Sequence, residues 1–195
     1  MRRTAWAGLM GTALLLPPSA LVAQLWEVHV GGVAGYGTAA ALGTGTGALV
    51  GLAPGRLAYA GLRWTRYAGS TTLVGAAPTQ TEVRSRAQVY TVDLSLMIPA
   101  GALEVLPGVG FGAASFRQDS RPGGAASTPW QTTSATEFFA SPGVAAKVSL
   151  GRFALIPEVQ YSLATQPRLS YPAPHNGLLA SVRVVMTFEI DRIRQ

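Results

Sequence analysis

The feature that most constrains the fold is an alternation of apolar and polar residues in the stretch GLLASVRVVMTFEI (177–190). Every second residue from Leu178 to Ile190 is apolar, whereas Arg183 and Glu189 fall in the other phase. Successive side chains of a β-strand point to opposite faces, so this period of two predicts a strand with one wholly apolar face. Such a strand needs an apolar environment on one side and a polar environment on the other.

The same alternation recurs through most of the preceding chain. It is clear in VYTVDLSLMIP, LEVLPGVGFGA, EFFASPGVAAKVSL and RFALIPEVQYSLA, and weaker in LWEVHVGGVAGY, LGTGTGALVGL and RLAYAGLRWT. These segments together predict about eight strands. Tight turns at 53–56, 99–101 and 150–152 alternate with polar links at about 69–82, 118–136 and 165–176, and the first link, near GTAA, is short. Short turns at one end and longer loops at the other are typical of an outer-membrane barrel.

Composition agrees with a lipid environment. Apolar residues make up 48% of the chain and charged residues only 12%, against about a quarter in soluble domains. Lipid tolerates no unpaired backbone donor, so a sheet within it must close on itself. The sequence therefore predicts an all-β fold, an eight-stranded antiparallel up-and-down transmembrane β-barrel over residues 24–195.

The amino-terminal residues have the form of a cleavable signal peptide. Arg2 and Arg3 precede an apolar run that ends near Leu16, and small residues follow. The run is too short to span about 30 Å of hydrocarbon. We expect residues 1–23 to be removed after Ala23, with cleavage after Ala20 as the alternative. An exported chain without cysteine has no disulfide scaffold.

Charged residues in the inward phase should fill the barrel interior. Because eight strands leave room only for side chains, we expect these charges to pair in a lumen network that leaves no continuous pore. The expected members are Glu27, Arg63, Asp93, Glu104, Lys147, Glu158, Arg183 and Glu189. Inward glycines should make room for these long side chains, and they stand at positions 43, 45, 47, 108, 110 and 112.

The outward phase predicts two girdles and a basic rim. Outward aromatic residues should gather at the two membrane interfaces. The upper girdle would hold Tyr36, Trp64, Tyr90, Phe138 and Tyr161, and the lower one Trp26, Phe153 and Phe188. Arginines at the loop-side strand ends form what we call the arginine rim, namely Arg66, Arg84, Arg86 and Arg117. Guanidinium groups suit phosphate, so we expect the rim to bind lipopolysaccharide, with a solvated rim of scattered charge as the alternative.

Two motifs give the chain a family resemblance over nearly the whole mature sequence. LPGVGFGAASF is similar to a Pro-x-x-Gly-x-Gly-aromatic strand, and SPGVAAKVSLGRFALIPEVQYSLA is similar to a penultimate hairpin. The chain thereby resembles the small outer-membrane β-barrel family, the eight-stranded OmpA/OmpX type. Members usually end on an aromatic residue used in barrel assembly, whereas EIDRIRQ follows Phe188 here. The resemblance implies an outer-membrane location and insertion by the barrel-assembly machinery.

Other chemistry is weakly indicated. GTGTGA (43–48) and GVGFGA (108–113) match dinucleotide patterns, but neither is followed by helical periodicity. His29 is expected to hydrogen-bond in the lumen, and His175 lies in the last loop; two distant histidines without cysteine give no metal site. The basic residues form no aromatic-interleaved patch, so nucleic acid is not an expected partner.

The function expected from these features is structural or interactive and not enzymatic, with no cofactor. The barrel would stabilise the outer membrane or present extracellular loops for adhesion, and loop residues Leu73, Val74, Trp130 and Tyr171 could contact a partner or pack together. Two alternatives stay open. One is an enzyme that modifies the acyl chains of lipid A, and the other is a soluble periplasmic barrel whose apolar face encloses a ligand.

Overall fold

A computed structural model describes residues 26–55, 57–124 and 127–190. The strands are β1 (Trp26–Gly37), β2 (Gly43–Pro54), β3 (Ala58–Val74), β4 (Thr81–Leu96), β5 (Ile98–Ala100), β6 (Leu103–Pro122), β7 (Gln131–Leu150), β8 (Phe153–Ala164) and β9 (Gly177–Ile190). The predicted signal peptide, residues 1–23, and its cleavage site lie outside the described residues. Within the described ranges there is no helix long and apolar enough to cross a membrane.

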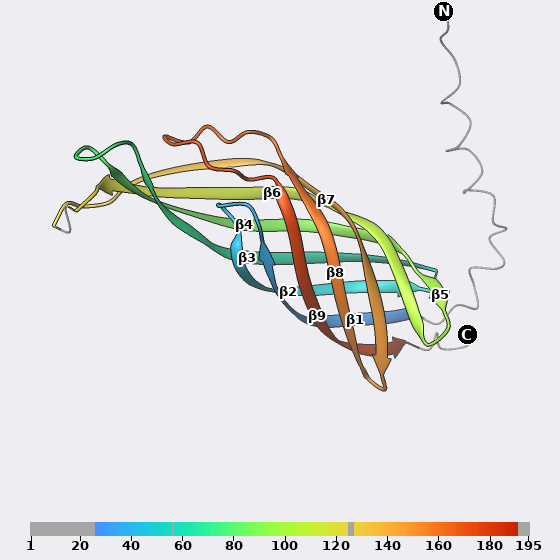
Figure 1. The fold of residues 1–195 in the computed structure, drawn as a ribbon. Helices are drawn as coiled ribbons and strands as arrows, with labels where there is room; N and C mark the ends of the chain where they lie inside the picture. Colours follow the sequence, from blue (N-terminus) through green and yellow to red (C-terminus); the bar gives the residue numbers. More distant parts are fainter. Residues whose placement is uncertain (1–25, 56, 125–126, 191–195) are drawn as a thin grey trace, which may run out of the picture.

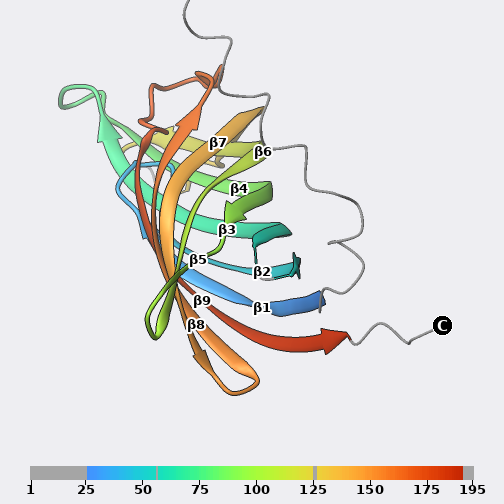
Figure 2. The same ribbon diagram turned by 90° about the vertical axis from the view of Figure 1, so that its right-hand side faces the viewer.

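The strands form one closed antiparallel barrel (Figures 1 and 2). Neighbours follow the order β4-β3-β2-β1-β9-β8-β7-β6-β5, and β4 also pairs with β6, which closes the ring. β5 continues β4 after Met97, and both pair with β6. The nine labelled strands therefore form the eight-stranded, up-and-down barrel that the sequence predicts.

Burial alternates along the strands in the predicted phase. In β8 the pattern is strict, with Phe153, Leu155 and Val159 exposed and Glu158 and Gln160 buried. In β9, Arg183 is buried between the exposed Val182 and Val184. The apolar face thus points outward and the charged face inward. A soluble barrel with its apolar face inside, the second alternative above, is wrong for this chain.

Two of the three long polar links are shorter than predicted because much of each is strand, whereas the third, 165–176, lies between β8 and β9 as predicted. In the region predicted as the link 69–82, β3 ends only at Val74 and β4 already begins at Thr81. In the region predicted as the link 118–136, β6 ends at Pro122 and β7 begins at Gln131. Residues 70–74, 81–86, 116–122 and 131–135 continue β3, β4, β6 and β7 beyond the end of β1 and β2, and we call them the extension. Figure 1 shows these four strands running past the others at the end of the barrel away from the last residues of β9.

Candidate functional site

An ionic layer crosses the middle of the barrel interior. Arg63 on β3 contacts Glu158 on β8 and lies 3.1 Å, through Nε, from Asp93 Oδ2 on β4. Arg183 on β9 contacts the other oxygen of Glu158, and its Nη1 is 3.6 Å from Asp93. All four side chains are buried, and Ser181 Oγ donates a 2.6 Å hydrogen bond to Glu158. Two arginines and two carboxylates therefore neutralise one another, which is the condition for burying charge.

A second group of charges lies nearer the ends with the short turns. Lys147 Nζ is 3.2 Å from Glu27 and 3.1 Å from Glu104, and it is buried. His29 Nε2 is 3.2 Å from the same Glu27 carboxylate. Glu189 stands opposite Glu27 in the register of β1 and β9, but its side chain is exposed at the strand end. The residues expected in the lumen network are thus divided between two groups, in which all but the partly exposed Glu104 are buried, and this exposed position.

Glycines make room for bulky lumen side chains, although not always for charges. A Cβ on Gly110 would lie 2.7 Å from Asp93 Oδ1 and 3.2 Å from Arg63 Nη2, so this glycine accommodates the ionic layer. Gly45 instead accommodates the ring of Tyr67, which a Cβ would approach to 2.5 Å. At Gly47 and Gly112 a Cβ would meet the backbone of a neighbouring strand.

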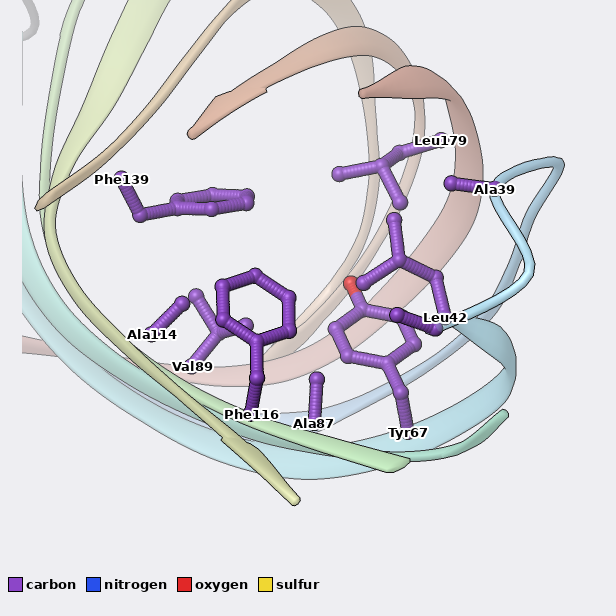
Figure 3. Close-up of a cluster of buried hydrophobic side chains, with 10 residues drawn as sticks. Ala39, Leu42, Tyr67, Ala87, Val89, Ala114, Phe116, Phe139 and Leu179 are labelled. Atoms are coloured by element: carbon purple, nitrogen blue, oxygen red, sulfur yellow. The ribbon is translucent and has the colours of Figure 1, made fainter. Parts of the chain in front are cut away.

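Two apolar clusters of buried side chains accompany the ionic layer inside the barrel. The upper cluster, drawn in Figure 3, contains Leu42, Tyr67, Phe116, Phe139 and Leu179, whose side chains converge inside the ring. Leu42 belongs to the short link between β1 and β2 and is fully buried. The lower cluster comprises Leu49, Ala53, Tyr59, Met97, Leu106, Ala145, Ala154, Ile156 and Val185. The sequence predicts the ionic network but not these two apolar clusters.

The remaining candidate groups occupy structural positions. GTGTGA lies within β2 and GVGFGA within β6, and neither opens a helix. The ring of His29 packs 5.5 Å from that of Tyr59, and the ring of His175 packs 6.0 Å from that of Phe116. Ser162 Oγ lies 3.2 Å from the backbone carbonyl of His175. Across the described ranges no cluster of metal-ligating side chains occurs.

The outward aromatic residues lie near the strand ends as predicted at Tyr36, Tyr161 and the lower girdle, whereas Trp64, Tyr90 and Phe138 lie within strands that continue into the extension. Trp64 pairs with Tyr90, Tyr90 with Ala113, and Ala113 with Phe138, so three aromatic side chains share one row around the wall. The upper set is exposed at Tyr36, Trp64, Tyr90, Phe138 and Tyr161, and the lower set at Trp26, Phe153 and Phe188. The apolar outer wall is therefore bounded by aromatic side chains at both ends, as interfaces with water require.

The arginine rim begins directly above the upper aromatic row. Arg66 follows Trp64 by two residues on the same outward face of β3 and is exposed. Arg86 and Arg117 are opposite one another in the register of β4 and β6, and Arg84 is opposite Asp119. The rim thus runs from the level of the aromatic row up the outward face of the extension.

Carboxylates and one tryptophan hold most of these arginines in place. Arg86 and Arg117 both pair with Asp119, to which Thr132 Oγ1 also donates a 2.7 Å hydrogen bond. Burial raises the pKa of Asp119, but the hydrogen bonds from Thr132, Arg86 and Arg117 outweigh it and leave this pKa below its ordinary value. The extension therefore keeps this carboxylate charged at neutral pH.

A second cluster lies one step further along the extension. Arg84 and Arg121 lie 4.2 and 4.3 Å from the centre of the Trp130 ring, so the indole contacts two cations. Both arginines also pair with Glu82, and the hydrogen bond from Arg121 lowers the pKa of that carboxyl. Arg121, which the sequence places in a loop, lies on β6 and adjoins the rim. Trp130 therefore packs within the chain, whereas Leu73 is exposed on β3.

The loop between β8 and β9 folds back onto the extension. The side chain of Gln118 on β6 donates to the carbonyl of Tyr171 at 3.0 Å and accepts from its amide at 2.9 Å. Thr133 and Ser170 hydroxyls are 2.8 Å apart. Leu169 packs against the upper apolar cluster. This loop therefore covers the lumen at the end where the extension begins.

Comparison with known proteins gives fold neighbours only. No protein-family model and no curated protein matches the chain. Among solved structures, a major outer membrane protein from Thermus thermophilus is similar, with a TM-score of 0.64, 14% identity and coverage of 85% of this chain and 99% of that one. At this identity the likeness concerns the fold.

Two further structures have lower scores. The N-terminal β-barrel domain of Pseudomonas aeruginosa OprF has a TM-score of 0.46 at 12% identity, covering 84% of this chain and 97% of that one. Yersinia pestis Ail, the attachment invasion locus protein, solved with the heparin analogue sucrose octasulfate, has a TM-score of 0.48 at 6% identity, covering 86% and 99%. On the likeness to the Thermus protein, the chain has the fold of the small outer-membrane β-barrel proteins, as its sequence motifs indicated.

Proposed function

We propose that this chain is an integral, non-enzymatic outer-membrane β-barrel, and that its arginine rim binds the phosphates of lipopolysaccharide in the outer leaflet. The observation that carries the proposal is the order of features along β3. Exposed Leu62 and Trp64 are followed on the same face by the exposed Arg66. The apolar wall, the aromatic row and the guanidinium group thus follow one another along the strand in the same order as the hydrocarbon core, the interface and the headgroups of a bilayer leaflet.

The membrane location is supported by the amount of apolar surface outside the barrel. Exposed large apolar side chains occur on every strand, among them Val30, Leu62, Val144 and Val184. Soluble monomers rarely expose contiguous apolar patches larger than a few hundred Å². A bilayer covers such a wall, and insertion by the barrel-assembly machinery is part of the proposal.

A structural and interactive role is supported by how the interior and the extension are built. The lumen is occupied by the ionic layer and two apolar clusters, and both histidines pack against aromatic rings. The extension carries four strands past the upper aromatic row, where they would stand above the lipid. We propose that it stabilises the leaflet through lipopolysaccharide and offers its outer face to an extracellular partner.

Gel mobility tests the barrel in the membrane. Outer membranes are separated and extracted with detergent, and samples are compared before and after boiling. A closed barrel should resist the detergent and migrate differently until heated. Recovery of the protein without detergent, with no heat-dependent shift, would contradict the proposal.

Thermal stability tests the rim. Adding lipopolysaccharide to the full chain refolded in detergent should raise its midpoint of unfolding, because a ligand that binds only the folded state stabilises it. The double variant Arg86→Gln and Arg117→Gln should lose most of this rise, and Arg168→Gln, in the β8–β9 loop, should keep it. The rise should also shrink as salt is added, since exposed charges are screened. An equal rise in both variants would contradict a phosphate-binding rim.

A further inference from the structure

Two apolar hollows lie one above the other on the lipid-facing wall of β2, β3, β4 and β6. The upper hollow has a volume of about 520 Å³ and is lined by Ala48, Val50, Leu62, Trp64, Tyr90 and Phe111 among others. The lower hollow has a volume of about 380 Å³, and its lining includes Ala58, Ala60, Leu94 and Pro107. Volumes of this size lie in the range of small-molecule sites.

Small outward residues between large ones produce the hollows. Ala48 is paired with Trp64 in the register of β2 and β3, so the wall has a depression next to the indole. Ala60 stands between Leu52 on β2 and Leu94 on β4, and it leaves the second depression. A wall that contacts only bulk lipid does not need depressions of this kind. The apolar lining fits hydrocarbon chains.

A free cation stands directly above the upper hollow. Arg66 is two residues from Trp64 on the same face, and strand geometry places them about 7 Å apart along β3. Among the residues that the structure describes, Arg66 has no carboxylate partner, whereas Arg84, Arg86 and Arg117 each contact one. An exposed guanidinium without a partner at the headgroup level suits a phosphate.

We propose that this wall holds one phosphorylated, multiply acylated glycolipid of the outer leaflet as a specific ligand. Its acyl chains would lie in the two hollows, and a phosphate would contact Arg66 with help from Arg86. The inference rests on the proposed function, and it adds a defined stoichiometry and an acyl-chain site to the rim. Apolar hollows below and positive charge above match the two ends of that lipid. In lipid, shape complementarity is what favours one apolar ligand over another.

Native mass spectrometry of the full chain in detergent tests the proposal, with bis-phosphorylated, hexa-acylated lipid A as the probe. The wild type should retain one lipid. The double variant Ala48→Leu and Ala60→Leu fills both hollows, and it should weaken retention about tenfold or more, since overfilled sites lose their contacts. Arg66→Gln should weaken retention about fivefold or more through loss of a charge-assisted contact. The matched control, Ala180→Leu on the exposed face of β9 across the ring from β3 and β4, should retain lipid like the wild type.

The outcomes separate this inference from the proposed function. If Arg66→Gln or the Arg86 and Arg117 variants weaken retention and filling the hollows does not, the rim stands and the acyl-chain site is wrong. If neither change matters, both are wrong. If the wild type appears as a dimer without lipid and filling the hollows dissociates it, the wall is an interface between copies and the inference is overturned. Dephosphorylated lipid A retained as well as the intact lipid would overturn the assignment of Arg66.

Discussion

Arg63 on β3 and Glu158 on β8 form an ion pair across the barrel interior, between strands that share no edge. The same carboxylate contacts Arg183 from the neighbouring β9. Glu158 therefore joins opposite walls of the ring, and both of its oxygens have a cationic partner. Removing a partner from such a buried group leaves uncompensated charge, which is more costly than losing a surface pair.

We predict that Glu158→Gln lowers the free energy of unfolding by about 3 to 5 kcal/mol, because Arg63 and Arg183 would share only Asp93. Glu104→Gln is the matched control. Its carboxylate pairs with Lys147 and is partly exposed, so the cost should be about 1 kcal/mol or less. Denaturant unfolding of both variants in lipid vesicles, followed by tryptophan fluorescence, gives the comparison. Equal costs would show that Glu158 does not hold the ionic layer together.

Gly110 provides a second test of the same layer. A Cβ there would lie 2.7 Å from Asp93 Oδ1 and 2.8 Å from Ser141 Oγ, so Gly110→Ala should displace the buried carboxylate and cost about 1 to 3 kcal/mol. Gly32→Ala on β1 is the control, because the nearest atom to its Cβ would be 3.6 Å away. That variant should be neutral or slightly stabilising. The same unfolding experiment tests this prediction. A neutral Gly110→Ala would mean that the ionic layer can accommodate the added methyl group.

The sequence predicts the barrel and the side of each strand because lipid imposes a strict rule. A residue such as Val182 or Val184 must be apolar if it faces lipid, so Arg183 between them can only face inward. The same rule identifies the outward phase of the rim, since the alternation continues from Tyr90 to Arg86. Closure follows from the same lipid environment, and the number of alternating segments gives the strand number and hence a narrow interior in which charges must pair.

The rule fails where lipid ends. In the extension neither face is apolar throughout, so the stretch from Thr81 to Arg86 has no apolar stripe and resembles a loop in the sequence. The contact of Trp130 with Arg84 and Arg121 depends on register across strands, which no local pattern records. Leu42 lies in a five-residue link where periodicity has no meaning, and its inward position is decided by packing.

Leu42 should contribute strongly to stability although it lies in a link between strands. It is fully buried in the upper apolar cluster, so Leu42→Ala should cost about 2 to 5 kcal/mol by leaving a cavity. Leu178→Ala is a suitable control, because Leu178 is 53% exposed on the outer wall and lipid can fill the space. We expect its cost to be clearly smaller in vesicles. Similar costs for the two variants would mean that the link does not seal the lumen.

The extension should stay ordered in mildly acidic conditions because the pKa of Asp119 is lowered in the folded state. A lowered folded-state pKa means that the carboxylate adds stability above its unfolded pKa, and this stability is lost as pH falls through the folded value. Hydrogen exchange of residues 116–122 and 131–136, corrected for intrinsic rates, should therefore show equal protection at pH 7 and pH 5. Protection should fall only below the ordinary aspartate pKa of 3.8.

Asp119→Asn should lose protection already at pH 7, because Arg86 and Arg117 would then face each other without a counter-charge. Protection that declines between pH 7 and pH 5 in the wild type, or that survives in the variant, would show that Asp119 does not hold the two strands together.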